Sequence, residues 1–169
     1  GRARKSHEIR ISWELPNELA VFKEEDGEQP FAVHKTYTLS LSEKANLLHD
    51  LQSWRGKPFT ESELASFDVC KVLGAACMVT IMHVEKSGNT YANVTTVTAM
   101  PKGMSCPKQV NPSLEYSLAE HDDRKFNSLP DFLRKIIAES DEYKALNAAT
   151  IQAANAVDPG GVAKGPALE

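Results

Sequence analysis

Six cationic and aromatic side chains give the clearest chemical signal in the sequence: Lys35, Tyr37, Arg55, Lys57, Lys86 and Tyr91. Exposed aromatic rings stack on nucleobases, and lysine or arginine side chains follow a phosphate backbone. We therefore predict that these six side chains line a groove for single-stranded nucleic acid. Each stacked ring would contribute about 1–3 kcal/mol per base, and the cations would make binding depend on salt.

A purely structural interpretation of the same residues stays open. Arg55 and Lys57 follow a helical pattern, where positive side chains are favoured by the helix dipole without any ligand. Tyr37 lies within an alternating apolar pattern and could be part of the core. Trp13 and Trp54 also fit apolar stripes, so we expect both in the core rather than in a groove.

Catalytic and metal-binding patterns are missing from the sequence. It contains no GxxxxGK[ST], GxGxxG or GxSxG motif, and its five histidines are scattered without HxH or HxxxH spacing. Its three cysteines show no CxxC spacing, which argues against a structural zinc site and a disulfide framework. We predict no catalytic residues, no metal ligands and no cofactor. An enzyme whose metal site is formed by distant residues, such as a nuclease accessory subunit, remains an alternative.

Alternation of apolar and polar residues predicts the strands that position these side chains. It is clear over residues 5–15 and 31–41, and residues 72–101 form two β-branched runs around Ser87-Gly88-Asn89, which is typical of a β-hairpin. Residues 18–23 and 114–118 are predicted as short additional strands. A helix is expected from Ser42 to Gly56, and a second follows the capping box of Thr60 and Glu63.

This order predicts a mainly β fold, an OB-fold-like five-stranded barrel with a helix pair between strands 3 and 4. We assign residues 1–110 to this domain. Residues 111–146 are predicted as a C-terminal extension with a helix that opens at Ser128-Leu129-Pro130-Asp131. Residues 147–169, rich in Ala, Gly and Pro, are predicted as a flexible tail.

Charge and composition bound the possible partners. Residues 1–110 carry equal numbers of basic and acidic side chains, so the net charge of −4 lies entirely in residues 111–169. Nucleic-acid binding would therefore need a local positive groove. No apolar run approaches the 18 or so residues of a membrane span, and the N-terminus lacks a signal-peptide core. We expect no membrane partner and a cytoplasmic location, that of the host cell if the protein is phage-encoded.

Four sequence pieces resemble a group of small bacteriophage proteins. They are KTYTLSL (35–41), WRGKPFTESEL (54–64), LGAAC (73–77) and GNTYAN (88–93). The group is similar to OB-fold single-stranded DNA-binding proteins of phage replication and recombination, and the resemblance covers residues 34–103. It implies that this chain binds single-stranded DNA.

Residues and resemblance together predict a single-stranded DNA-binding protein that is not an enzyme and that acts in phage DNA replication or recombination. Replication or recombination proteins, and a second copy of the chain, are further candidate partners. The alternative is a protein–protein adaptor of a replication or recombination complex that uses the barrel and the C-terminal helix.

Overall fold

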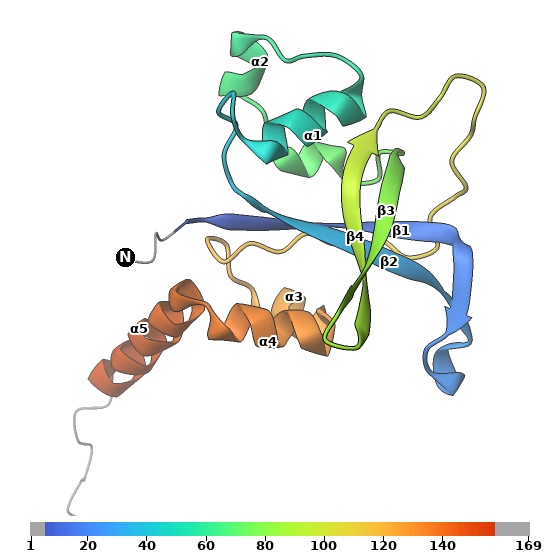
Figure 1. Cartoon of the computed structure of the whole chain (residues 1–169). Coiled ribbons are helices and arrows are strands. Elements are labelled where there is room, and N and C mark those ends of the chain that lie inside the picture. The colour runs from blue at the N-terminus through green and yellow to red at the C-terminus, as the bar shows by residue number, and fades with distance from the viewer. Residues whose placement is uncertain (1–5, 158–169) are drawn as a thin grey trace, which may run out of the picture. The chain divides into compact units, whose positions relative to one another are not determined.

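The computed structural model describes residues 6–157, with the backbone alone for residues 154–157. The chain divides into two compact units, Gly1–Leu114 and Glu115–Glu169, and each is described here by itself (Figure 1). Within the described residues, no helix has both the length and the apolar character needed to cross a membrane.

The first unit consists of two β-hairpins separated by helices. Strands β1 (Glu8–Val21) and β2 (Glu28–Thr38) precede helices α1 (Asn46–Arg55) and α2 (Glu61–Ala65), and strands β3 (Met78–Lys86) and β4 (Asn89–Thr98) follow. Two single-turn 3₁₀ helices, η1 (Glu24–Asp26) and η2 (Val69–Val72), lie in the connections. Figure 1 shows the β3–β4 hairpin in green and the β1–β2 hairpin in blue.

β1 pairs with β2 along almost its whole length in antiparallel register, with Trp13 opposite Val33. The register shifts between Leu15 and Leu19, around Pro16. Proline has no N–H to donate to a ladder and is found in sheets mostly at edges and bulges. The prediction of a separate strand over residues 18–23 is therefore wrong, because β1 continues through the irregularity to Val21.

The predicted hairpin within residues 72–101 is confirmed as β3 and β4. Its turn is formed by Ser87 and Gly88, both with positive φ (54° and 79°). Two successive positive φ values fit the right-handed twist of the flanking strands. Asn89, which the sequence placed in the turn, is instead the first residue of β4 and pairs with Lys86.

The four strands form two separate two-stranded sheets, and the described residues contain no closed barrel. The fold is mixed α/β, so the prediction of a mainly β, five-stranded barrel is not confirmed. Residues 114–118, predicted as a strand, pair with no strand in the described part of the chain. The segment before them carries Pro101, Pro107 and Pro112, which lack the N–H groups that pairing needs.

α1 contacts both β2 and β4 and joins the two hairpins through a shared core. The buried residues of this core come from the three elements and β1: Trp13, Val33, Tyr37, Leu47, Leu51, Val94 and Val97. α1 begins at Asn46 and not at the predicted Ser42, and its N-cap residue Ala45 offers no side-chain acceptor. Its predicted end is confirmed: Gly56 has φ 77° and donates its N–H to the carbonyls of Gln52 and Ser53.

The second unit contains helices α3 (Asp123–Ser128), α4 (Asp131–Glu139) and α5 (Asp141–Val157). α4 confirms the helix predicted to open at Ser128-Leu129-Pro130-Asp131. α5 covers residues 147–157, so this part of the predicted flexible tail is helical, as its alanine content favours. The rest of that prediction, residues 158–169, lies outside the described residues.

Candidate nucleic-acid interface

One face of the β3–β4 hairpin near its tip combines an aromatic ring, a cation and two amides. The register places Met82 opposite Asn93, Val84 opposite Tyr91 and Lys86 opposite Asn89. Directly paired residues in an antiparallel ladder point to the same side of the sheet, and so do residues two positions apart along a strand. These six residues, which we call the hairpin face, are all solvent-exposed.

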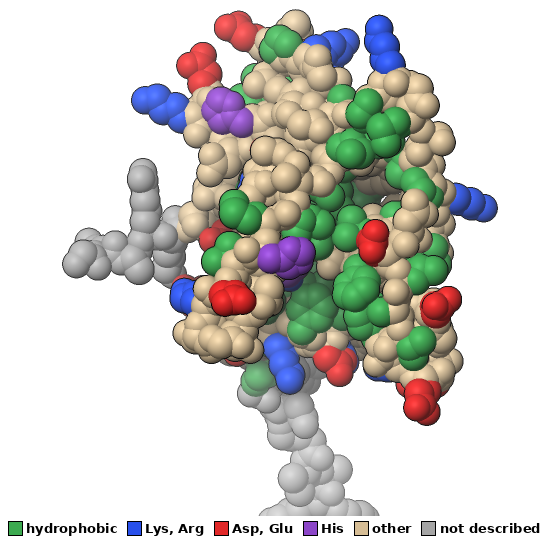
Figure 2. Space-filling model, turned by 45° about the vertical axis from the view of Figure 1, so that its right-hand side comes forward, with side chains coloured by type: hydrophobic (Ala, Val, Ile, Leu, Met, Phe, Trp, Pro, Cys, Tyr) green, Lys and Arg blue, Asp and Glu red, His purple; other side chains and the backbone are tan. Residues whose placement is uncertain are grey.

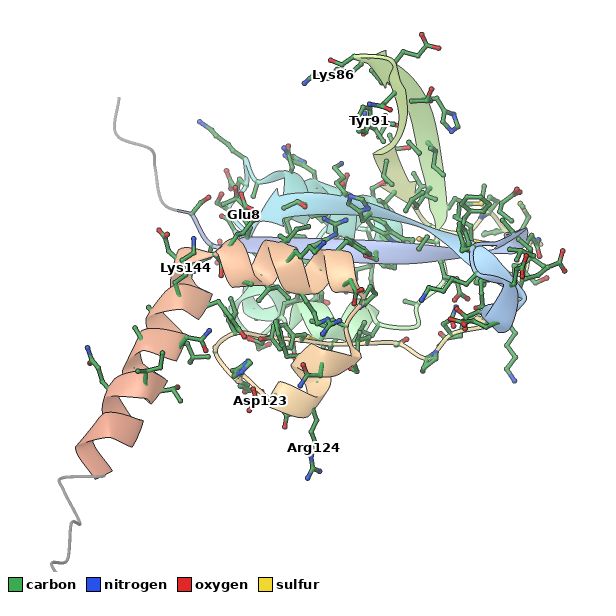
Figure 3. All side chains as sticks on the ribbon, turned by 90° about the horizontal axis from the view of Figure 1, so that it is seen from below. Glu8, Lys86, Tyr91, Asp123, Arg124 and Lys144 are labelled. Atoms are coloured by element: carbon green, nitrogen blue, oxygen red, sulfur yellow. The ribbon has the colours of Figure 1, made fainter. Side chains whose placement is uncertain are left out.

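The exposure of the larger side chains on the hairpin face is considerable: 54% for Met82, 39% for Val84 and 49% for Tyr91. Val84, Lys86, Tyr91 and Asn93, together with Ser87 of the turn, line an open hollow of about 400 Å³. Figure 3 shows Lys86 and Tyr91 close together near the tip of the hairpin. A half-exposed ring beside an ammonium group can stack on a base while the cation contacts the adjacent phosphate.

Lys35 and Tyr37, two of the six predicted site residues, belong to a structural network on β2. Both donate hydrogen bonds of 2.7 Å to the same carboxylate oxygen, Oδ2 of Asp50 on α1. Burial, followed by the hydrogen bond to Asp50, raises the pKa of Tyr37 far above its ordinary value. With only 4% of its surface exposed, Tyr37 is a core residue, so its predicted role as a stacking platform does not fit its position.

Arg55 is likewise engaged within the protein. Its guanidinium forms a bidentate ion pair with the Glu63 carboxylate and stacks on the Phe59 ring at 4.5 Å. Glu63 also closes the predicted capping box of α2, which is confirmed by reciprocal hydrogen bonds with Thr60. Lys57, in the turn between α1 and α2, is exposed to solvent.

The six predicted side chains therefore occupy three places: the Asp50 network, the α1–α2 junction and the hairpin face. Only Lys57, Lys86 and Tyr91 are exposed. On the face drawn in Figure 2, lysine and arginine side chains project apart from one another and form no single basic patch. Of the three places, the hairpin face alone pairs an exposed ring with an exposed cation.

The sequence interpretation missed three members of the hairpin face: Met82, Val84 and Asn93. Alternation alone divides each strand into two sets but does not say which set of β3 shares a side with which set of β4. The ladder also shifts its register between Thr80 and Ile81. Counting outward from the two-residue Ser87-Gly88 turn would have identified all three.

Among the described residues, no three His, Cys, Asp or Glu side chains gather in a way that could hold a metal ion. In the second unit, the Tyr116 hydroxyl lies 2.7 Å from Nδ1 of His121, and Nε2 of His121 lies 3.1 Å from Asp123. The rings of Tyr116, His121, Phe126 and Tyr143 contact one another in one cluster. This arrangement is typical of a small aromatic core with a satisfied histidine.

No protein-family model, no curated protein and no solved structure matches the chain.

Proposed function

We propose that this protein binds single-stranded DNA without sequence preference, and that it does so through the hairpin face. The observation that carries the proposal is the half-exposed Tyr91 ring next to Lys86. Both belong to the hairpin face, whose side chains are all exposed to solvent. In this proposal the protein is not an enzyme, and it acts in phage DNA replication or recombination as the sequence resemblance implies.

The composition of the hairpin face supports binding that tolerates any sequence. Every base has a π-face, so stacking on Tyr91 does not discriminate between bases. Met82 and Val84 extend the apolar surface beside the ring. The amides of Asn89 and Asn93 carry both donors and acceptors and can adapt to different base edges. Lys86 supplies the phosphate contact and makes binding sensitive to salt.

We also propose that the two hairpins and α1 follow an OB-fold-like arrangement. It is supported by the order of two antiparallel hairpins separated by α1 and by the irregularity in β1 near Pro16. Bulged first strands let a sheet bend strongly, as small barrels require. In such an arrangement the second hairpin projects from the body and presents one face to a strand of DNA.

A titration of dye-labelled oligo(dT) with the protein, followed by fluorescence anisotropy, tests the proposal. We expect saturable binding at low salt that weakens as salt is raised. No change in anisotropy at low salt and micromolar protein would refute the proposed function.

A protein–protein adaptor is the second candidate, and an observation on α4 favours it. Phe132 and Ile136 lie one turn apart on this helix, and each is 52% exposed. Changing both to aspartate should leave oligo(dT) binding unaltered if DNA binding is the function of the hairpin face. Under the adaptor hypothesis, the same double variant loses its protein partner, while Tyr91→Ala keeps it.

A further inference from the structure

A second hollow of about 450 Å³ lies between α1, α2 and η2 in the first unit, and none of its lining residues belongs to the hairpin face. We call it the α1–α2 pocket. Its volume falls within the range of pockets that bind small ligands. The side chains that matter for its chemistry are Trp54, Arg55, Phe59, Glu63, Phe67 and Lys71.

Defined interactions hold the aromatic walls of this pocket in place. Nε1 of Trp54 donates a hydrogen bond of 3.0 Å to the Ala76 carbonyl. Phe59 and Phe67 meet edge to face, with their ring centroids 4.7 Å apart. The Phe59 N–H also donates to the Gln52 side chain at 3.1 Å. A ligand that enters therefore meets rings that are already ordered, which reduces the entropic cost of binding.

The charges of the α1–α2 pocket select the kind of ligand. The Arg55–Glu63 pair offers donors and acceptors side by side, which suits a neutral planar group with both kinds of atom on its edge. The hydrogen bond from Arg55, followed by one from the Thr60 N–H, lowers the pKa of Glu63 to about 2, so the carboxylate is ionised at neutral pH and stays paired with Arg55. Lys71 is exposed on the pocket wall, and no ion pair joins it to another described residue, so it is available to an anionic group.

A nucleotide meets these requirements, since it joins a flat, hydrogen-bonding base to a phosphate. An acidic peptide meets them less well, because its apolar and carboxylate side chains bring no flat group that both donates and accepts hydrogen bonds. The pocket also lies at the start of β3, at the end of the hairpin away from its tip. Ala76 on its wall precedes β3 by two residues, whereas Lys86 ends β3, about 30 Å away at the usual rise of a strand.

We propose that the α1–α2 pocket binds one nucleotide of the single strand, with its base against the aromatic rings and its phosphate at Lys71. This inference rests on the proposed function and adds a second point of contact at the opposite end of the β3–β4 hairpin. Two contacts on one strand raise the overall affinity above that of either alone.

Tryptophan fluorescence gives a direct test, because Trp54 lines the pocket and Trp13, the other tryptophan, is only 7% exposed. In Trp13→Phe, Trp54 is the sole reporter. We expect oligo(dT) to quench its emission over the same concentrations that raise the anisotropy of labelled oligo(dT). Thymidine 5′-monophosphate should quench it too, at higher concentration. If Trp13→Phe does not fold, the wild-type protein is titrated instead, and its two tryptophans, whose ring centroids lie 6.0 Å apart, report the change together.

Reversing the charge of one lysine in the pocket and of one outside it tests whether the pocket itself contacts DNA. Lys71→Glu should weaken oligo(dT) binding about tenfold, through the loss of one phosphate contact and added repulsion. Lys44→Glu makes the same change at an exposed lysine outside the pocket and should alter affinity less than twofold.

The outcomes distinguish the two proposals. Binding by anisotropy without any change in Trp54 emission, and with Lys71→Glu equal to Lys44→Glu, would overturn the pocket and leave the proposed function standing. Quenching by an acidic peptide ending in phenylalanine, but not by thymidine monophosphate, would also overturn it. Absence of oligo(dT) binding at low salt would instead refute the proposed function, on which the pocket inference depends.

Discussion

Arg55 and Glu63 form a bidentate ion pair that joins the last residue of α1 to the first turn of α2. Glu63 at the same time accepts a hydrogen bond of 2.8 Å from the Thr60 N–H. One carboxylate thus caps a helix and fixes the angle between two helices. Local structure therefore accounts for Arg55, Thr60 and Glu63 in the WRGKPFTESEL segment (54–64) without any ligand.

Glu63 should make the stability of the protein depend on pH in acid. Its pKa is lowered to about 2 in the folded protein, chiefly by the hydrogen bond from Arg55, against an ordinary value of 4.5. The stabilisation it provides is therefore complete above pH 4.5 and is lost as the pH falls towards 2. Glu63→Gln keeps a residue that can close the capping box but removes the ionisable group.

Melting temperatures of the wild type and Glu63→Gln between pH 7 and pH 2 check this prediction. We expect the wild type to be more stable at neutral pH and the two curves to converge below pH 4. Parallel curves over the whole range would show that the ion pair contributes nothing that depends on protonation.

Tyr37 should matter for stability rather than for binding. Tyr37→Phe keeps the buried ring but removes the hydrogen bond to Asp50, and a bond to a charged partner is worth about 1.5–3 kcal/mol. Urea denaturation measures the loss. Tyr91→Phe is the matched control, since it removes a hydroxyl from a half-exposed ring, and its stability should change by less than about 0.5 kcal/mol. Equal effects of the two substitutions would contradict the structural role of Tyr37.

Glu14 on β1 should hold the loop of residues 101–113 against the first unit. Its carboxylate accepts hydrogen bonds from the Val110 N–H at 2.6 Å, the Asn111 N–H at 3.0 Å and the Asn111 side chain at 2.8 Å. Burial alone would raise the pKa of Glu14, but these hydrogen bonds outweigh it and lower the pKa. The anchor therefore stays ionised through the neutral range.

Limited proteolysis with trypsin tests this anchor, because the loop contains Lys102 and Lys108. Glu14→Ala should be cut in the loop several-fold faster than the wild type, as loops without hydrogen-bonded backbone are preferred protease sites. Glu8→Ala removes an exposed glutamate from the same strand and should be cut at the wild-type rate. Equal rates for both variants would mean that Glu14 does not restrain the loop.

Local signals in the sequence predicted local structure well. The Gly56 helix end, the Thr60–Glu63 capping box and the Ser87-Gly88 turn each depend on a few neighbouring residues, and all three are present. Relations between distant segments were harder to predict. Nothing near Lys35 identifies Asp50 as its partner, and the failure of the two sheets to join depends on pairing between segments that are far apart in the chain.

The candidate site shows the same contrast between features that local sequence predicts and features that depend on distant contacts. Tyr91 and Lys86 could be identified as an exposed pair near a turn, whereas the burial of Tyr37 depended on packing against α1. Its alternation partner Val33 is buried with it, but Phe31 and Leu39 of the same set are 44% and 50% exposed. Alternation therefore identified the side of β2 correctly but not how much of that side the rest of the unit covers.

The most direct test of the central claim compares two single substitutions on opposite faces of the β3–β4 hairpin. Tyr91→Ala removes the ring of the hairpin face, and His83→Ala removes an exposed ring that points to the other side. Labelled oligo(dT) is titrated with each variant and with the wild type at low salt. We predict that Tyr91→Ala weakens binding between about fivefold and 150-fold, the loss of about 1–3 kcal/mol for one stacked base, and that His83→Ala changes it less than twofold. Equal affinities for Tyr91→Ala and the wild type would contradict the account.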